Sequence, residues 1–317
     1  MTMRRNLILF VTFASAAATL VPAQSASAAD SGSIPGLSGV WSHPALPWFE
    51  PPASGPGPVL NKSRGEQRPG GISGSPASIP STVGVSNYDQ LVGDYSNPIL
   101  QPWAAEVVKK YGDISLAGIT YPNPGNQCQP RPVPFIFKHN VIEVIQQADK
   151  VTLLYGEDHE VRRAHLNANH PTPVAPSWYG DSVGRYEGDT LVVDTVGINP
   201  DRKYAMVDLF GTPYTKALHV VERYRLRDYD DVKDAIERNI KENWLFGGDV
   251  FSKFRGKFLQ LHLTIEDTGA FTTPWTATLT YVPAREQLFA ETVCAENRSQ
   301  YYYNNEADVP TASKPDF

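Results

Sequence analysis

From Phe135 onward the chain is a series of short apolar runs separated by turn residues, and this spacing limits the possible folds more than any other feature. The runs are rich in Val, Ile, Leu, Thr and Tyr, which favour extended backbone. Many short strands at near-regular spacing indicate an antiparallel barrel or sandwich, not alternating strands and helices. The expected strands are Val141–Gln146, Val151–Tyr155, Val161–Leu166, Ser182–Tyr186, Thr190–Val196, Leu218–Leu226, Phe258–Ile265, Trp275–Val282 and Leu288–Cys294.

Two local patterns interrupt the strands. The segment Tyr186–Thr190 predicts a tight hairpin turn centred on Gly188. The segment Asp230–Trp244 has apolar residues at four-residue spacing, which predicts a single helix at a barrel mouth.

The N-terminal part has a different composition. Residues 30–98 are rich in Pro, Gly and Ser and lack an apolar period, so they predict an extended arm. A short helix is expected at Pro102–Tyr111, stopped by Gly112. The arm offers three aromatic anchors, Trp41, Trp48 and Phe49.

The first residues predict export. Arg4 and Arg5 precede an apolar stretch from Leu7 to Val21, and Ala26-Ser27-Ala28 provides the small residues that a signal peptidase requires. We therefore expect a cleaved signal peptide at 1–28 and a periplasmic or secreted protein. The Arg pair leaves a twin-arginine route open beside ordinary secretion.

Charge narrows the range of partners. The formal net charge is −6, and removing the two Arg of the signal peptide makes it −8. Nucleic acids and anionic membranes need clustered Lys and Arg, and we find no such cluster. No Cys stands near the cleavage site to carry a lipid, so we expect no membrane anchor. Phosphate loops and dinucleotide fingerprints are absent from the sequence, and we expect no cofactor.

Two cysteines, Cys128 and Cys294, predict one disulfide in an oxidising compartment. Such a bond would close a loop of about 165 residues and stabilise the fold by roughly 4–5 kcal/mol through chain entropy. A catalytic thiol is the alternative, although neither Cys has a neighbouring motif that would lower its pKa.

Several sequence blocks resemble a large family of secreted bacterial proteins of uncharacterised function. The longest is Trp178–Thr195 (WYGDSVGRYEGDTLVVDT). The others are Cys128–Pro132, Arg162-Arg163, Leu218–Arg223, Thr264–Asp267, Pro274-Trp275 and Cys294–Asn297. The sequence of the expected hairpin, Tyr186–Thr190, is also similar to that of lipocalin-like barrels. His165–His170 and the segment Asp230–Trp244 depart from the family pattern.

The resemblance implies a fold more than an activity. We expect an all-β protein, an antiparallel lipocalin-like barrel with a Pro/Gly-rich N-terminal arm and one inserted helix. The expected divisions are a signal peptide (1–28), the arm with its short helix (29–134), a β-barrel domain (135–297) and a C-terminal tail (298–317).

Gly180–Gly184 matches the G-x-S-x-G pattern of a hydrolase nucleophile, with Ser182 at its centre. That motif needs a strand before the Ser and a helix after it. Here prolines precede it and a hairpin follows, so glycines that shape a strand entry are the better interpretation.

Glu222 is the more informative residue. It shares a strand face with Leu218, Val220, Tyr224 and Leu226, while His219, Arg223 and Arg225 line the other face. A carboxylate among apolar neighbours needs a cation or keeps its proton. Arg163 is the expected partner. Two roles compete: a Glu–Arg pair that braces the barrel, and a general acid/base with an orienting Arg163 or His219.

Asp194 repeats this theme between Val192 and Val196. On Phe258–Ile265, either His262 and Glu266 face inward and join Glu222, or the leucines of that strand face inward as core. The leucine face is the safer prediction.

Other site residues carry weaker signals. The histidines 159, 165 and 170 lack helix-spaced metal-ligand geometry, so we expect no metal. Aromatic residues could stack on a ligand or plug the barrel ends; the candidates are Trp178, Trp244, Trp275 and Tyr301–Tyr303. The expected ligand site consists of four residues: Trp178, Trp275, Arg223 and His262.

Three functions follow from these patterns. The leading hypothesis is an exported barrel that binds a small, largely apolar or aromatic molecule. The second is a cofactor-independent lyase, isomerase or hydrolase that uses Glu222, with Arg163, His219 and Asp194, on a small extracytoplasmic substrate. The third is an envelope interaction protein that uses the arm. The oligomeric state is open.

Overall fold

The computed structural model describes residues 34–43, 48–65, 84–87, 90–158, 160–241, 253–284 and 293–294. The expected signal peptide, Trp244, Tyr301–Tyr303 and most of the strand expected at Leu288–Cys294 lie outside these ranges, as does His159.

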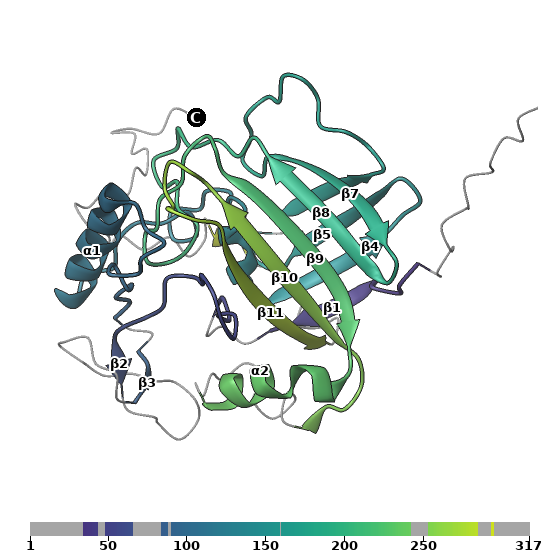
Figure 1. Cartoon of the computed structure of the whole chain (residues 1–317), viewed down its shortest axis with the longest axis horizontal. Helices are drawn as coiled ribbons and strands as arrows, with labels where there is room; N and C mark the ends of the chain where they lie inside the picture. Colours follow the sequence, from purple (N-terminus) through teal and green to yellow (C-terminus); the bar gives the residue numbers. More distant parts are fainter. Residues whose placement is uncertain are drawn as a thin grey trace, which may run out of the picture. The chain divides into compact units, whose positions relative to one another are not determined.

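Nine strands in the described part of the chain close into one barrel (Figure 1), which confirms the predicted all-β barrel. Their order around the wall is β1-β11-β10-β9-β8-β7-β6-β5-β4, and β1 pairs with β4 to close the ring. The strands are β1 (Gly39–Ser42), β4 (Val141–Gln146), β5 (Lys150–Tyr155), β6 (Val161–Leu166), β7 (Asp181–Glu187), β8 (Thr190–Val196), β9 (His219–Arg227), β10 (Phe258–Glu266) and β11 (Trp275–Pro283). A separate pair joins β2 (Arg64–Gly65) and β3 (Val85–Ser86).

The sheet is mixed, so the expectation of a wholly antiparallel barrel is wrong at one place. Strands β6 and β7 are parallel, with His165 opposite Val183 and Leu166 opposite Gly184. Parallel neighbours need a crossover of a dozen or more residues, which the long connection 167–180 supplies. The β7–β8 connection is the predicted hairpin, with Gly188 at a φ of 59°.

The barrel also includes a strand from the arm. Trp41 of β1 is buried in the barrel, so the wall begins well before the expected boundary at 135. Trp48 and Phe49 are buried as well, and Phe49 packs edge-on against Trp275 of β11. The three predicted anchors are therefore core residues.

Alternation along the strands decides what fills the interior. Leu259, Leu261, Leu263 and Ile265 of β10 are fully buried, and they face the equally buried alternate residues of β11. The leucine face was the predicted core, and it is the core. His262 and Glu266 are exposed on the outer face.

Two α-helices lie in the described residues. The helix α1 (Pro102–Leu116) runs past its expected end at Tyr111, and Gly112 lies inside it. Gly112 is buried against Val92, where a larger side chain would be crowded. The helix α2 (Tyr229–Lys241) packs Val232 and Ile236 on Phe258 and Val282 beside the ends of β10 and β11 (Figure 1). A 3-10 turn, η1 (Phe135–Lys138), precedes β4. Neither α-helix has the length and apolar character needed to cross a membrane, as far as the described residues go.

Cys128 and Cys294 form the predicted disulfide. The bond joins residues separated by 166 positions. Cys128 precedes β4, and Cys294 follows β11.

Replacing both cysteines with Ala should lower the free energy of unfolding by up to about 5 kcal/mol, because the unfolded chain regains the entropy of a long open loop. Urea titration of the oxidised wild type, the reduced wild type and the double variant measures this. Equal midpoints for all three proteins would contradict the stabilising role.

Candidate functional site

A buried ion pair crosses the barrel interior. The side chain of Arg162 on β6 is 2% exposed and that of Glu222 on β9 is 0% exposed. The guanidinium makes two hydrogen bonds to the carboxylate: Nη2 lies 2.6 Å from Oε1 and Nη1 lies 3.1 Å from Oε2. Bidentate contact of this kind is the strongest form of a carboxylate–Arg pair.

Hydroxyl groups from four strands complete the pair. Tyr224 donates to Glu222 Oε2 at 2.7 Å, and Arg162 donates to Tyr155, Ser182 and Thr195. Burial, and then the charge of Glu222, raise the pKa of Tyr224, so its phenol keeps the proton that it donates. The ring of Phe137 lies 5.6 Å from Arg162 Cζ.

The partner expected for Glu222 was the wrong arginine. Arg163 points outward and is exposed, whereas Arg162 and Ala164 point into the barrel. The expectation rested on the strand face that Arg163 shares with Val161 and His165, but that face is the outer one. The buried carboxylate needs a cation on the inner face, and Arg162 supplies it. Glu222 itself lies on the predicted inner face.

This geometry favours the bracing role of the pair over an acid/base role. Ser182 points into the same interior, hydrogen-bonded to Arg162 and Thr195, and not outward as a nucleophile. Glu222 has no accessible surface, so no space as large as a water molecule adjoins it. A substrate has no contact with either residue.

A second cluster lies on the outer wall, where two of the predicted catalytic residues meet. Asp194 on β8 contacts His219 on β9, with 3.0 Å between Oδ2 and Nε2. Its other oxygen lies 3.0 Å from Nε2 of His170, which follows β6. His170 Nδ1 lies 2.6 Å from Asp181 of β7, and His219 Nδ1 lies 3.7 Å from Glu266 of β10.

The contacts in this cluster shift the pKa values of Asp194 and His219. Hydrogen bonds from His219 and then His170 lower the pKa of Asp194. The hydrogen bond to Asp194 raises the pKa of His219, against the effect of burial. A partly exposed imidazole held by a carboxylate can donate or accept a proton, so His219 is suited to acid/base chemistry.

Sequence reasoning missed His170 in this cluster. It was weighed only as a metal ligand, because its partners Asp181 and Asp194 lie on other strands. The signal available was the alternation that puts Asp181, Asp194 and His219 on outward faces of neighbouring strands.

The four residues expected to bind a ligand do not form one site. Arg223 and His262 are cross-strand neighbours on the outer wall, and Arg223 pairs with Glu187 at 2.7 Å. Trp178 lies under the guanidinium of Arg202, 3.0 Å from Cζ to the ring centroid. Trp275 is buried in the core against Phe49 and Phe271.

A cleft of about 510 Å³ opens beside the disulfide. Its apolar lining comes from Leu91, Ile119, Tyr121 and Leu209. Its polar lining comes from Ser115, Thr120, Asn123, Asn126, Arg131, Lys138 and Glu157.

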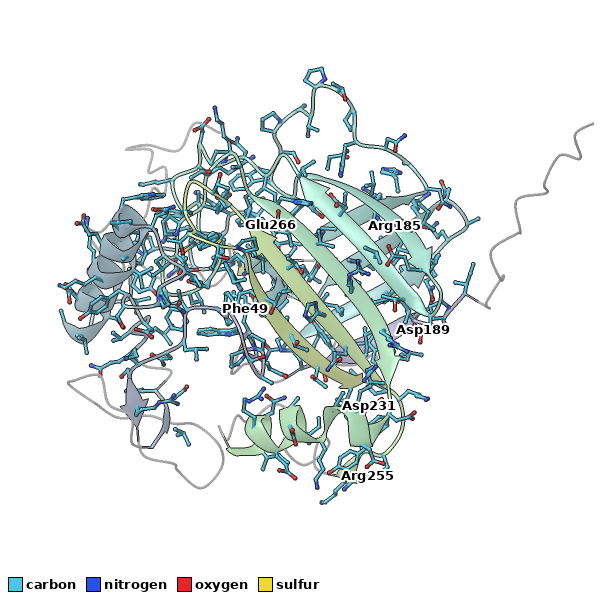
Figure 2. The ribbon with its side chains drawn as sticks, viewed as in Figure 1. Phe49, Arg185, Asp189, Asp231, Arg255 and Glu266 are labelled. Atoms are coloured by element: carbon cyan, nitrogen blue, oxygen red, sulfur yellow. A yellow bond between two sulfur atoms is a disulfide. The ribbon has the colours of Figure 1, made fainter. Side chains whose placement is uncertain are left out.

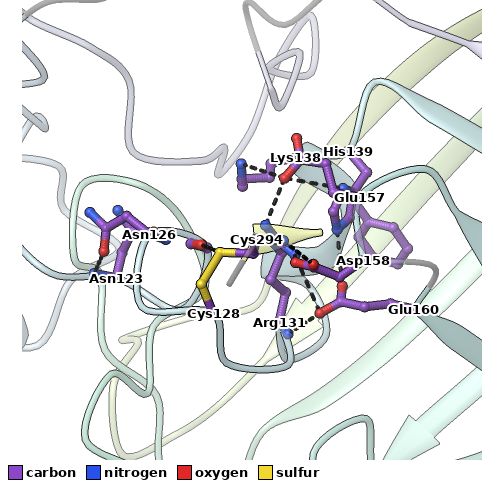
Figure 3. A network of polar contacts seen from close by, with 12 residues as sticks. Asn123, Asn126, Cys128, Arg131, Lys138, His139, Glu157, Asp158, Glu160 and Cys294 are labelled. Atoms are coloured by element: carbon purple, nitrogen blue, oxygen red, sulfur yellow. Dashed lines mark hydrogen bonds and ion pairs between the residues drawn. A yellow bond between two sulfur atoms is a disulfide. The ribbon is translucent and has the colours of Figure 1, made fainter. Parts of the chain in front are cut away.

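Figure 3 shows the charged network of this cleft. Arg131 is buried, and its guanidinium reaches Glu157 at 2.7 Å, Asp158 at 3.3 Å and Glu160 at 3.4 Å. Asp158 also accepts the backbone N–H of Cys294, and the disulfide sulfur of Cys294 lies 3.2 Å from the carbonyl oxygen of Gly125. The disulfide and the cleft wall are thus one connected structure.

Burial changes the ionisation of groups in this network. Burial raises the pKa of Glu160 to about 7, partly offset by Arg131. Burial and the charges of Arg131 and Lys138 hold the pKa of His139 well below its usual range, so its Nε2–H donates to Glu160 as a neutral ring at 2.9 Å. Burial lowers the pKa of Lys138, although Glu157, 3.7 Å away, opposes this.

Within the described ranges, no group of three or more His, Cys, Asp or Glu side chains is arranged to hold a metal ion. The chain matches no protein-family model, no curated protein and no solved structure.

Replacing Arg162 with Met should destabilise the protein by about 3–5 kcal/mol, because Glu222 is left charged and unpaired in the core. Adding Glu222→Leu should recover part of the loss, since an apolar pair removes the stranded charge.

Chemical denaturation of Arg162→Met and of Arg162→Met/Glu222→Leu, beside Arg163→Met, provides the test. The exposed neighbour should change stability by less than about 0.5 kcal/mol. Equal losses for Arg162→Met and Arg163→Met would contradict the assignment of the inner face.

Proposed function

We propose that the protein is exported and binds a small organic molecule that combines an apolar part with an acidic or strongly polar group. The binding site is the cleft beside the disulfide. One observation carries this proposal: an opening of about 510 Å³ places apolar side chains opposite Arg131 and Lys138. Small-molecule sites commonly enclose roughly 300–1,000 Å³ and combine apolar walls with a few polar groups.

The chemistry of the lining supports this ligand class. Arg131 is already occupied by three carboxylates, so Lys138 is the cation with remaining capacity to meet an anionic group. Asn123 and Asn126 add amide groups to the lining, and Ile119 and Tyr121 offer an apolar surface.

The barrel interior is a poor site for the same ligand. The Arg162–Glu222 pair and the surrounding aromatic residues are buried, with Glu222 at 0% exposure. The proposal therefore keeps small-molecule binding and moves it from the lumen, where a lipocalin-like barrel holds its ligand, to the outer cleft. The disulfide is compatible with an oxidising compartment outside the cytoplasm.

The proposal predicts that 1-anilinonaphthalene-8-sulfonate, an aromatic anion, binds the full chain at one site. Lys138→Gln removes the positive charge and should weaken binding about five- to tenfold, as expected for loss of a charge-assisted contact. Ile119→Glu adds a negative charge to the rim and should weaken binding similarly. Fluorescence titration measures both.

The matched control is Lys257→Gln, which removes an exposed lysine outside the cleft lining. Lys257 directly precedes β10 and pairs with Asp228, which directly follows β9. It should bind the probe like the wild type. If Lys138→Gln and Ile119→Glu also bind like the wild type, the cleft is not the site and the proposal fails.

A further inference from the structure

The connection between β6 and β7, residues 167–180, has one polar attachment along most of its length. Residues 168, 169, 171–173, 175 and 176 are exposed. The ends are held by backbone bonds, Asn167 N–H to the Gly184 carbonyl at 2.7 Å and Ser177 N–H to the Gly197 carbonyl at 3.0 Å. Among the described residues, His170 makes the only hydrogen bonds from positions 168–176 to the barrel wall.

Both ring nitrogens of His170 face carboxylates. Nδ1 lies 2.6 Å from Asp181 Oδ1, and Nε2 lies 3.0 Å from Asp194 Oδ1. A carboxylate can only accept a hydrogen bond, so both nitrogens must carry hydrogen. The two contacts of His170 with Asp181 and Asp194 therefore require a positively charged imidazolium.

Loss of this proton would convert the attachment into repulsion. A neutral imidazole has one nitrogen lone pair, which would face an anionic oxygen. Asp181 and Asp194 would also lose the cation between them.

The charged groups around His170 come from every neighbouring strand. They are His165 on β6, Asp181 and Arg185 on β7, Asp194 on β8, His219 on β9 and Glu266 on β10. Figure 2 labels Arg185 and Glu266 on this wall. Arg185 is occupied by Glu187 at 2.6 Å, and His219 binds the other oxygen of Asp194.

A cleft of about 390 Å³ lies under the segment, lined by residues 167–170 together with Val183, Gly184, Arg185 and Asp194. Asp194 thus lines the cleft and at the same time contacts both His170 and His219.

We propose that residues 167–180 form a strap that charged His170 fastens to the barrel wall, and that deprotonation of His170 releases it to uncover the Asp194–His219 pair. This inference is independent of ligand binding beside the disulfide. Burial lowers the pKa of His170, but hydrogen bonds to Asp181 and Asp194 outweigh it, so the pKa lies above its ordinary 6.5. The strap is therefore fastened at pH 6.5 and below, and it is released as the pH rises through the raised pKa.

Hydrogen–deuterium exchange of peptides covering 167–180 tests this on the full chain between pH 5 and 9, with rates corrected for intrinsic exchange and read at Asn167 and Ser177, whose amides bond to the wall. Protection in the wild type should fall several-fold as the pH rises, while β8 peptides stay protected. His170→Gln cannot carry the charge, so this segment should exchange quickly at every pH. Asp181→Asn removes one of the two anions and should move the transition to lower pH.

The matched control is His165→Gln, which replaces an exposed histidine on β6 and should keep the wild-type profile. The proposal is overturned if wild-type protection does not change with pH, or if His170→Gln retains the wild-type pH profile. A transition that stays in place in Asp181→Asn would equally exclude the two-carboxylate clamp.

Discussion

Arg162 and Glu222 put a complete ion pair where water cannot reach, and this condition organises the rest of the barrel. Removing two charges from water costs several kcal/mol each, and only close pairing with further hydrogen bonds can offset the cost. The required hydroxyls come from Tyr155, Ser182, Thr195 and Tyr224, so β5, β7, β8 and β9 must all present a polar residue at one level. A shift of one residue in any of these strands would turn its hydroxyl outward.

The filled interior has a consequence for function. A barrel that encloses a ligand needs space at its centre, and here that centre holds the ion pair and large aromatic side chains. Ligand binding and acid/base chemistry therefore have space only on the outer side of the barrel wall. Two outer clefts differ in character: the one beside the disulfide combines apolar surface with Arg131 and Lys138, whereas the one under residues 167–180 adjoins the histidine–carboxylate cluster.

The parallel pair β6–β7 links the fold to that cluster. A hairpin between these strands would leave no long connection, whereas the parallel arrangement requires one that passes outside the wall. His170 lies in this connection, so the same topological feature that makes the sheet mixed also brings the histidine to Asp181 and Asp194. The disulfide similarly ties Cys294 to the loop that forms the other cleft.

The sequence alone determined the positions of β4 to β11, the hairpin at Gly188, the disulfide and the buried face of β9 and β10, because alternation, turn chemistry and cysteine count are local properties. It also selected Glu222, Asp194 and His219 as unusual. It could not choose Arg162 over Arg163, because adjacent residues differ only in the face they occupy. Only the tertiary structure decided which arginine meets Glu222, that β1 belongs to the wall, and that His170 reaches Asp194. Those contacts join residues 24 to 60 or more positions apart, and such pairs are brought together by barrel closure and register.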